Sequence, residues 1–296
     1  MEMGDIMKFY SYLKNRRDNS YFVYEDNYFE DMDELKKSFF SILSHELMTP
    51  LNLMFSSLQI FENHYTNSDY LKDDNKTENC FQTLQNNCLR LYKQIRNIMD
   101  LTKIKNNYFD LELRRVNLVE VIQEIIKSTN GYLENIDREI IFYTDKKNIF
   151  VVCDRGCLER VILNLLSNAY KNTEAGGVVY LSLFSKKEKV IITVRDTGKG
   201  INKEEVDKIF RPFYRIDNSF TREYEGCGLG LAIVRELVNL HEGKINVESI
   251  YGKGSEFTVD LPKKVGEKTE SIVYAVNDLM EQVKIEFSDL EPYVNR

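Results

Sequence analysis

Residues 158–171, LERVILNLLSNAYK, decide the fold of this chain. Their apolar side chains recur at the steps of three and four that place residues on one face of a helix. The buried face is predicted to consist of Leu158, Val161, Ile162, Leu165, Leu166 and Ala169. Asn164, Asn168 and Lys171 share the opposite face at i, i+4 and i+7. Asparagine is a poor helix former, so its presence twice in this stripe indicates a binding site. The asparagine oxygens suit Mg²⁺, and the lysine charge suits phosphates. An ordinary polar helix face is the alternative.

The sequence around this helix, predicted over residues 154–171, is that of a mixed domain. Residues 116–128 predict a short strand and a helix, and residues 229–241 predict another helix. Strands are predicted at 139–143, 149–153, 178–184, 190–195, 244–249 and 255–261. Helices on one face of a mainly antiparallel sheet form a two-layer sandwich. The expected fold class is therefore α+β.

The N-terminal third predicts a helical hairpin. Apolar residues from Leu35 to Phe61 indicate one long amphipathic helix, and a polar stretch at 63–76 predicts a turn. A coiled-coil seam follows, in which apolar residues alternate at steps of three and four. It consists of Phe81, Leu84, Cys88, Leu91, Ile95 and Ile98. One hairpin has little to pack against, so two copies forming a dimeric four-helix bundle, and hence a homodimer, are expected.

The two ends of the chain are less distinctive. Residues 1–32 predict at most a short helix before Arg16. In residues 265–296, apolar side chains from Ile272 to Val283 stand at helical spacing and predict an appended amphipathic helix. We expect this tail helix to pack on the protein or to be solvated, rather than to be regulatory.

The first helix of the hairpin contains SHELMTP at 44–50. A neutral imidazole such as that of His45 is a competent nucleophile near pH 7, and the adjacent Glu46 can fix its tautomer and take its proton. Thr49 lies one helical turn from His45. Pro50 lacks an N–H and should bend or loosen the helix beside His45. A surface histidine without a chemical role is the alternative.

Two glycine-rich elements follow the strands. In DTGKGI, 196–201, the Asp196 carboxylate at a strand end can accept a hydrogen bond from the adenine amine and repel a guanine carbonyl. Gly198 and Gly200 let the backbone approach a ligand closely. In GCGLGL, 226–231, glycines at a helix N-terminus suit a polyphosphate. Each element alone could be a simple turn.

Between these elements, FRPFYR at 210–215 precedes a polar stretch that ends at Glu225. This pattern is typical of a lid over a nucleotide, with aromatic side chains that anchor its base. A surface loop with buried anchors is the alternative.

Composition excludes several classes of protein. The 296 residues carry a net charge of −7, which argues against bulk binding to nucleic acid or anionic lipid. No run approaches the roughly 20 apolar residues that span a bilayer, and we expect no signal peptide. The five cysteines form no CxxC pair, and their spacing does not match a zinc site. This pattern favours free thiols in a reducing cytosol. We expect a cytoplasmic location, either as a soluble protein or as the cytoplasmic part of a membrane-bound one.

In order along the chain, SHELMTPLN, NLLSNAYK, DTGKGI, FRPFYR and GCGLGLAI resemble the H, N, G1, F and G2 boxes of bacterial two-component sensor histidine kinases. The resemblance runs from Leu35 to Pro262. It implies a HisKA-type dimerisation and phosphotransfer domain at 33–105 and an ATP-binding domain of the GHKL or Bergerat type at 112–264. Residues 106–111 would be a linker, residues 1–32 an input or linker segment, and residues 265–296 a tail.

The resemblance also implies roles in the phosphotransfer domain. His45 matches the phosphoacceptor, and Glu46 matches the acidic neighbour that accepts the imidazole proton. Thr49 matches the position that orients water for removal of phosphate from a response regulator.

In the ATP-binding domain, Asn168 matches the Mg²⁺ ligand, with Asn164 in support and Lys171 near the phosphates. Asp196 matches the carboxylate that reads adenine. Arg215 is a candidate for binding the γ-phosphate. The other positions that match residues around the nucleotide are Gly198, Gly200, Gly226, Gly228, Leu229 and Gly230.

The function implied is that of a protein histidine kinase that uses ATP and Mg²⁺, phosphorylates His45 and passes the phosphoryl group to an aspartate of a response regulator receiver domain. Phosphatase activity on the regulator is expected as well. Two alternatives stay open. The chain could be a binding module that sequesters a regulator without turnover. It could also be another ATPase of the same sandwich fold, such as a chaperone or a mismatch-repair protein, although those lack the SHELMTP helix.

Overall fold

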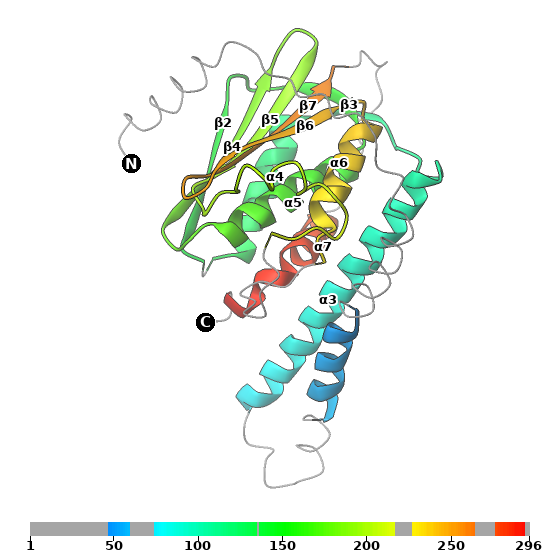
Figure 1. Cartoon of the computed structure of the whole chain (residues 1–296), viewed down its shortest axis with the longest axis vertical. Helices are drawn as coiled ribbons and strands as arrows, with labels where there is room; N and C mark the ends of the chain where they lie inside the picture. Colours follow the sequence, from blue (N-terminus) through cyan, green and yellow to red (C-terminus); the bar gives the residue numbers. More distant parts are fainter. Residues whose placement is uncertain (1–46, 60–73, 135, 217–226, 264–275, 294–296) are drawn as a thin grey trace. The chain divides into compact units, whose positions relative to one another are not determined.

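The computed structural model describes residues 47–59, 74–134, 136–216, 227–263 and 276–293 (Figure 1). The predictions for residues 1–32, for His45 and Glu46, and for the first part of the turn at 63–76 lie outside these ranges. Helix α3 (Asp74–Lys105) starts within the predicted turn, so the turn ends before Asp74.

The hairpin consists of a helix at 47–59, which continues through Pro50, and α3. The two helices contact each other where the thiol of Cys88 lies 3.3 Å from the sulfur of Met54. Large apolar side chains of both helices remain exposed, at Met48, Leu51, Leu53, Phe55, Leu58, Phe81, Tyr92, Ile95 and Met99. The predicted seam is therefore helical, and three of its residues, Phe81, Cys88 and Ile95, are exposed to solvent in a single chain.

A five-stranded sheet forms the scaffold of the second region, with strand order β2-β4-β5-β7-β6. Its strands are β2 (Arg138–Thr144), β4 (Gly177–Ser185), β5 (Lys189–Asp196), β6 (Lys244–Ile250) and β7 (Gly254–Pro262). Only β2 and β4 pair in parallel, and the other neighbours are antiparallel. The short strands β1 (Arg114–Asn117) and β3 (Phe150–Cys153) form a separate antiparallel pair. The mainly antiparallel sheet confirms the prediction.

Helices α4 (Leu118–Tyr132), α5 (Arg155–Asn172) and α6 (Gly230–Leu240) cover one face of this sheet (Figure 1). The N-termini of α4 and α5 are capped by side chains, because Asn117 accepts from the Val119 amide and Asp154 accepts from the Cys157 amide. All six apolar positions predicted for the core face of α5 are buried. The α+β sandwich expected from the sequence is confirmed.

The tail forms α7 (Val276–Phe287) and the short 3₁₀ helix η1 (Ser288–Tyr293). Val283, Phe287 and Leu290 are fully buried, and the Phe287 ring packs edge-on against Tyr170 of α5, with 5.7 Å between ring centroids. Burying such side chains stabilises the fold by about 1.5–3 kcal/mol each. The expected tail helix is thus present, and of the two arrangements expected for it, packed or solvated, the structure shows the packed one. Ile272 lies outside the described residues.

All five cysteines are free, as predicted. Burial raises the pKa of the Cys153 thiol to about 12, so this sulfur stays protonated and unreactive at neutral pH. Among the helices that the structure describes, none has both the length and the apolar character required to cross a membrane.

Candidate functional site

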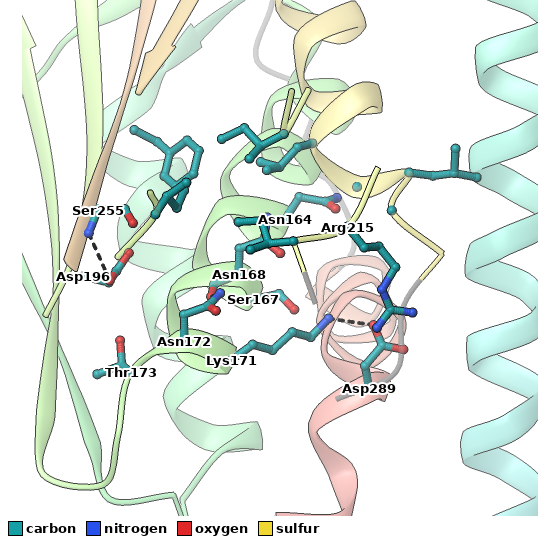
Figure 2. A pocket seen from close by; sticks show the side chains of 18 of the residues that line it. Asn164, Ser167, Asn168, Lys171, Asn172, Thr173, Asp196, Arg215, Ser255 and Asp289 are labelled. Atoms are coloured by element: carbon teal, nitrogen blue, oxygen red, sulfur yellow. Dashed lines mark hydrogen bonds and ion pairs between the residues drawn. The ribbon is translucent and has the colours of Figure 1, made fainter. Parts of the chain in front are cut away.

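A cavity of about 800 Å³ lies where α5, the start of α6 and the ends of β5 and β7 meet (Figure 2). This volume is typical of pockets for small molecules. Many residues singled out from the sequence line it, namely Asn164, Asn168, Lys171, Asp196, Gly200, Arg215, Gly228, Leu229 and Gly230. The fold therefore brings the NLLSNAYK, DTGKGI, FRPFYR and GCGLGL segments to one place.

Asp196 ends β5 and is only 3% exposed. Its Oδ1 accepts a hydrogen bond from the amide of Gly198 at 2.9 Å. It accepts another from the amide of Ser255 at 3.2 Å (Figure 2). Burial raises the pKa of this carboxyl, and the two amide hydrogen bonds oppose the shift. The result is a rigidly held acceptor at the wall of the cavity.

Two glycines of the DTGKGI segment permit this close packing. A Cβ at Gly198 would lie 1.9 Å from the carbonyl oxygen of Asn172. Gly200 has a φ of +67°, in the left-handed region that favours glycine, and lines the cavity. Gly198 is not among the lining residues and instead lets the segment pack against the end of α5. Gly226 lies outside the described residues.

The polar stripe of α5 points its amides toward the cavity. Asn164 is buried, and its Nδ2 donates to the carbonyl of Arg160 at 3.0 Å. Its Oδ1 lies 2.9 Å from where a Cβ at Gly230 would stand, so α6 begins with a glycine at a close approach. Asn168 lies one turn further along α5, half-buried in the cavity wall. The two amides therefore lie at the wall of the cavity, and the Asn164 amide oxygen lies beside the N-terminus of α6.

Lys171 lies at the same wall, with an ionic partner that could not be predicted from the sequence. Its Nζ lies 2.7 Å from Oδ2 of Asp289 in η1. Burial lowers the pKa of Lys171, and the Asp289 carboxylate opposes that shift. Figure 2 shows Lys171, Arg215 and Asp289 converging on one side of the cavity.

The aromatic residues of FRPFYR anchor the chain where the predicted lid begins. Phe210 is buried and packs edge-on against Phe257 of β7, with 6.4 Å between ring centroids. Phe213 packs against the core as well. From position 217 to its end at Glu225, the predicted lid stretch lies outside the described residues.

The residues predicted for phosphotransfer do not belong to this cavity as described. Thr49 is half-buried in the helix at 47–59, and it is not among the described residues that line the cavity. His45 and Glu46 lie outside the described ranges.

Several residues of α3 that belong to none of the five motifs also line the cavity. Arg90, Lys93 and Asn97 lie at helical spacing on a face of α3 away from the predicted seam. Their i, i+3, i+7 spacing was a readable signal for a second polar face. What that face contacts depends on tertiary packing.

Comparisons with known proteins agree with this arrangement. Residues 35–107 match the model of the His Kinase A (phospho-acceptor) domain. Residues 153–265 match the model of the histidine kinase-, DNA gyrase B- and HSP90-like ATPase, an ATP-binding domain.

Relatives that match across both of these domains are also histidine kinases. The sensor histidine kinase WalK of Bacillus subtilis is 32% identical over 82% of this chain and 39% of its own length. The chain spans 19–39% of the length of the first curated relatives that it matches.

Two solved structures share the fold. Histidine kinase AdeS of Acinetobacter baumannii aligns over 75% of this chain and 98% of its own, with a TM-score of 0.58 and 24% identity. Histidine kinase ThkA, solved in complex with the response regulator TrrA, aligns over 80% of this chain and 66% of that chain, with a TM-score of 0.56 and 22% identity. Because a phosphoacceptor module is followed by an ATP-binding module whose motifs meet in one cavity, the chain belongs to the sensor histidine kinases of two-component systems.

Proposed function

We propose that this chain is an ATP-dependent protein histidine kinase that phosphorylates His45 and passes the phosphoryl group to an aspartate of a response regulator. The observation that carries the proposal is the cavity that gathers the α5 amides, Lys171, Asp196 and the glycine segments at one wall. The phosphotransfer domain would span 33–105 and the ATP-binding domain 112–264, joined by a linker at 106–111.

The adenine end of the cavity is assigned to Asp196. Oδ1 is held by the amides of Gly198 and Ser255, so the carboxylate cannot rotate freely. Its second oxygen would accept a hydrogen bond from the exocyclic amine of adenine. A guanine carbonyl at the same place would meet a negative charge.

The phosphate end is assigned to α5 and its neighbours. Amide oxygens are ligands that Mg²⁺ accepts, and Asn168, supported by Asn164, provides one at the cavity wall. This donor set fits the ion, which when bound would offset charge on the phosphates. Lys171 and Arg215 would bind phosphate oxygens, as would the backbone amides of 228–230 at the start of α6.

The reaction requires an in-line displacement. A ring nitrogen of His45 forms a bond to the γ-phosphorus while the bond from phosphorus to the β,γ-bridging oxygen breaks and ADP leaves. Glu46 takes the proton from the other ring nitrogen. An aspartate of the regulator then displaces the imidazole from phosphorus. The solved complex of ThkA with a response regulator supports this second step.

We further infer a homodimer through the helical hairpin. The exposed apolar side chains of α3, among them Phe81, Ile95 and Met99, lie on a helix whose polar face packs elsewhere. A second copy would cover this apolar face in a four-helix bundle.

The direct test is incubation of the chain with Mg²⁺ and γ-labelled ATP. We expect label that is stable to alkali and lost in acid, as a phosphorus–nitrogen bond requires. α-Labelled ATP is the control and should label nothing. Binding of ATP without any transfer would instead favour the binding module, and ATP hydrolysis without labelled protein would favour another ATPase of the same fold.

Replacing Thr49 by alanine tests the phosphatase part of the proposal. We expect autophosphorylation to change less than about twofold, whereas dephosphorylation of the regulator slows by about tenfold or more, because the hydroxyl that orients water is lost. Both rates are measured on the same preparation with a phosphorylated receiver domain. Ser57→Ala, a buried hydroxyl that bonds its own helix backbone, is the control. An unchanged dephosphorylation rate in Thr49→Ala would contradict the role.

A further inference from the structure

The C-terminal segment brings a carboxylate to the cavity wall that no step of the proposed reaction uses. Asp289 of η1 lines the cavity and is largely buried. Its Oδ2 lies 2.7 Å from Nζ of Lys171 on α5 and 3.3 Å from Nζ of Lys93 on α3. One carboxylate oxygen therefore bridges the helical hairpin and the ATP-binding domain.

Glu286, one turn earlier, extends the same bridge. It is fully buried, and its carboxylate pairs with Arg96 of α3 and lies 3.8 Å from Nε of Arg160 on α5. Its backbone oxygen accepts from Lys93 at 2.7 Å and from the Ser167 hydroxyl at 3.0 Å. The end of α7 is thus bonded to both α3 and α5.

Several charged side chains meet at this junction. Among the described residues they include the cations Arg90, Lys93, Arg96, Arg160 and Lys171 and the carboxylates Asp100, Glu286 and Asp289. Buried charges are costly unless they are paired. Moving Asp289 away from Lys171 would take this carboxylate from the ammonium group, and a polyphosphate is a ligand whose negative charge would replace it.

The ionisation states fit this arrangement. Burial alone would raise the pKa of Asp289, but Lys171 and Lys93 hold the pKa of this carboxyl well below its usual range. Burial alone would lower the pKa of Lys93, but Asp289 and Glu286 outweigh it and raise the pKa. Asp289 is therefore an anion across the neutral range.

We propose that Asp289 competes with the phosphates of ATP for Lys171. ATP binding would then break the ion pairs through which Asp289 of η1 links α3 to the ATP-binding domain. The inference rests on the proposed function, which assigns the phosphates to Lys171. It follows because Asp289 and a phosphate oxygen would take the same place on the ammonium group. When Asp289 leaves Lys171, the ion pair from the same carboxylate oxygen to Lys93 of α3 is lost with it.

The apolar residues of α7 distinguish this role from simple packing. Leu279, Val283 and Phe287 anchor the helix through buried apolar surface, which the Asp289 side chain does not supply. A buried ion pair contributes little net stability compared with apolar contacts. The Asp289 carboxylate is thus the part of the segment that a ligand can displace while α7 keeps its place.

Asp289→Asn tests the competition. The substitution keeps the size of the side chain and removes its charge, so we expect ATP to bind about tenfold tighter or more, while adenosine, which lacks phosphates, binds as before. Autophosphorylation at ATP concentrations below saturation should rise to a similar extent. Glu281→Gln removes an equal charge from the exposed face of α7 and is the matched control, with no expected change.

The outcomes separate the two proposals. If adenosine and ATP bind the wild type but Asp289→Asn leaves ATP affinity unchanged or weaker, the competition is wrong and the proposed function stands. If neither adenosine nor ATP binds the wild type, the proposed function fails, and the inference with it.

A second measurement needs no variant and applies even if Asp289→Asn fails to fold. Backbone hydrogen exchange in the wild-type chain is followed by segment with and without ATP. We expect ATP to speed exchange in residues 288–293 and adenosine to leave it unchanged. Slower or unchanged exchange in this segment with bound ATP would overturn the inference.

Discussion

The His45→Gln chain, incubated with Mg²⁺ and γ-labelled ATP, should carry no acid-labile label while it binds ATP as tightly as the wild type. A glutamine amide has no nucleophilic nitrogen, because its lone pair is delocalised into the carbonyl, whereas a neutral imidazole has one. Glutamine is also a good helix former, so the substitution does not disfavour a helix at position 45. Removal of the nucleophile leaves no alternative path, and the loss should be complete within detection.

The chain provides its own control for this experiment. His64 is the other histidine of the N-terminal third, and His64→Gln should be labelled like the wild type. His241 is the remaining histidine, and it is buried with Nδ1 2.8 Å from the Leu237 carbonyl and Nε2 accepting from the Asp154 amide. It is therefore part of the scaffold. Acid-labile label retained in His45→Gln would contradict the assignment of the phosphoacceptor.

Asp196→Asn should weaken ATP binding by about 100-fold or more, which corresponds to about 2.7 kcal/mol. The new amide oxygen can still accept from the Gly198 and Ser255 amides, so the loop should keep its shape. The new NH₂ group would then replace the oxygen that we assign to the adenine amine. Two donors would face each other, and an unpaired buried donor costs far more than a lost contact.

The same substitution should change base selectivity. The NH₂ group can donate to the guanine carbonyl, which the carboxylate of the wild type would repel, so the preference for ATP over GTP should fall or reverse. Calorimetric titration with both nucleotides measures this. Asp145→Asn, on the exposed loop after β2, is the control for removal of one negative charge. ATP affinity within twofold of the wild type in Asp196→Asn would exclude Asp196 as the residue that reads adenine.

Much of the fold could be predicted because its signals are local. The apolar face of α5, the strands that flank the turn at 186–188 and the helix that follows the GCGLGL segment depend on periodicity within ten or twenty residues. The extent of the hairpin helix was less predictable. The polar residues 74–76 read as a turn, yet they are the first residues of α3, because end positions of helices accept turn-forming residues.

The candidate site was predictable only in part. Asp196 and the glycines could be identified from the short motifs that contain them. The structure places them at the cavity or beside it. Ser255 could not be found from the sequence, because its backbone amide reaches Asp196 through the antiparallel pairing of β5 with β7. Nearly every residue type has a backbone N–H, so the identity of a residue does not show which amide donates to Asp196.

The sequence by itself determined the modules of this protein, their order and the identity of most residues that carry chemistry, because these depend on residue type and short spacing. Only the tertiary structure decided that the tail is a packed helix and that Asp289 pairs with Lys171, 118 residues away, and with Lys93, 196 residues away. An acidic side chain on a helix pairs with whatever cation packing places beside it, and loop closure over such distances has no local pattern. Electrostatic partners across a fold are therefore set by how the helices dock, and here that docking places an internal anion at the cavity.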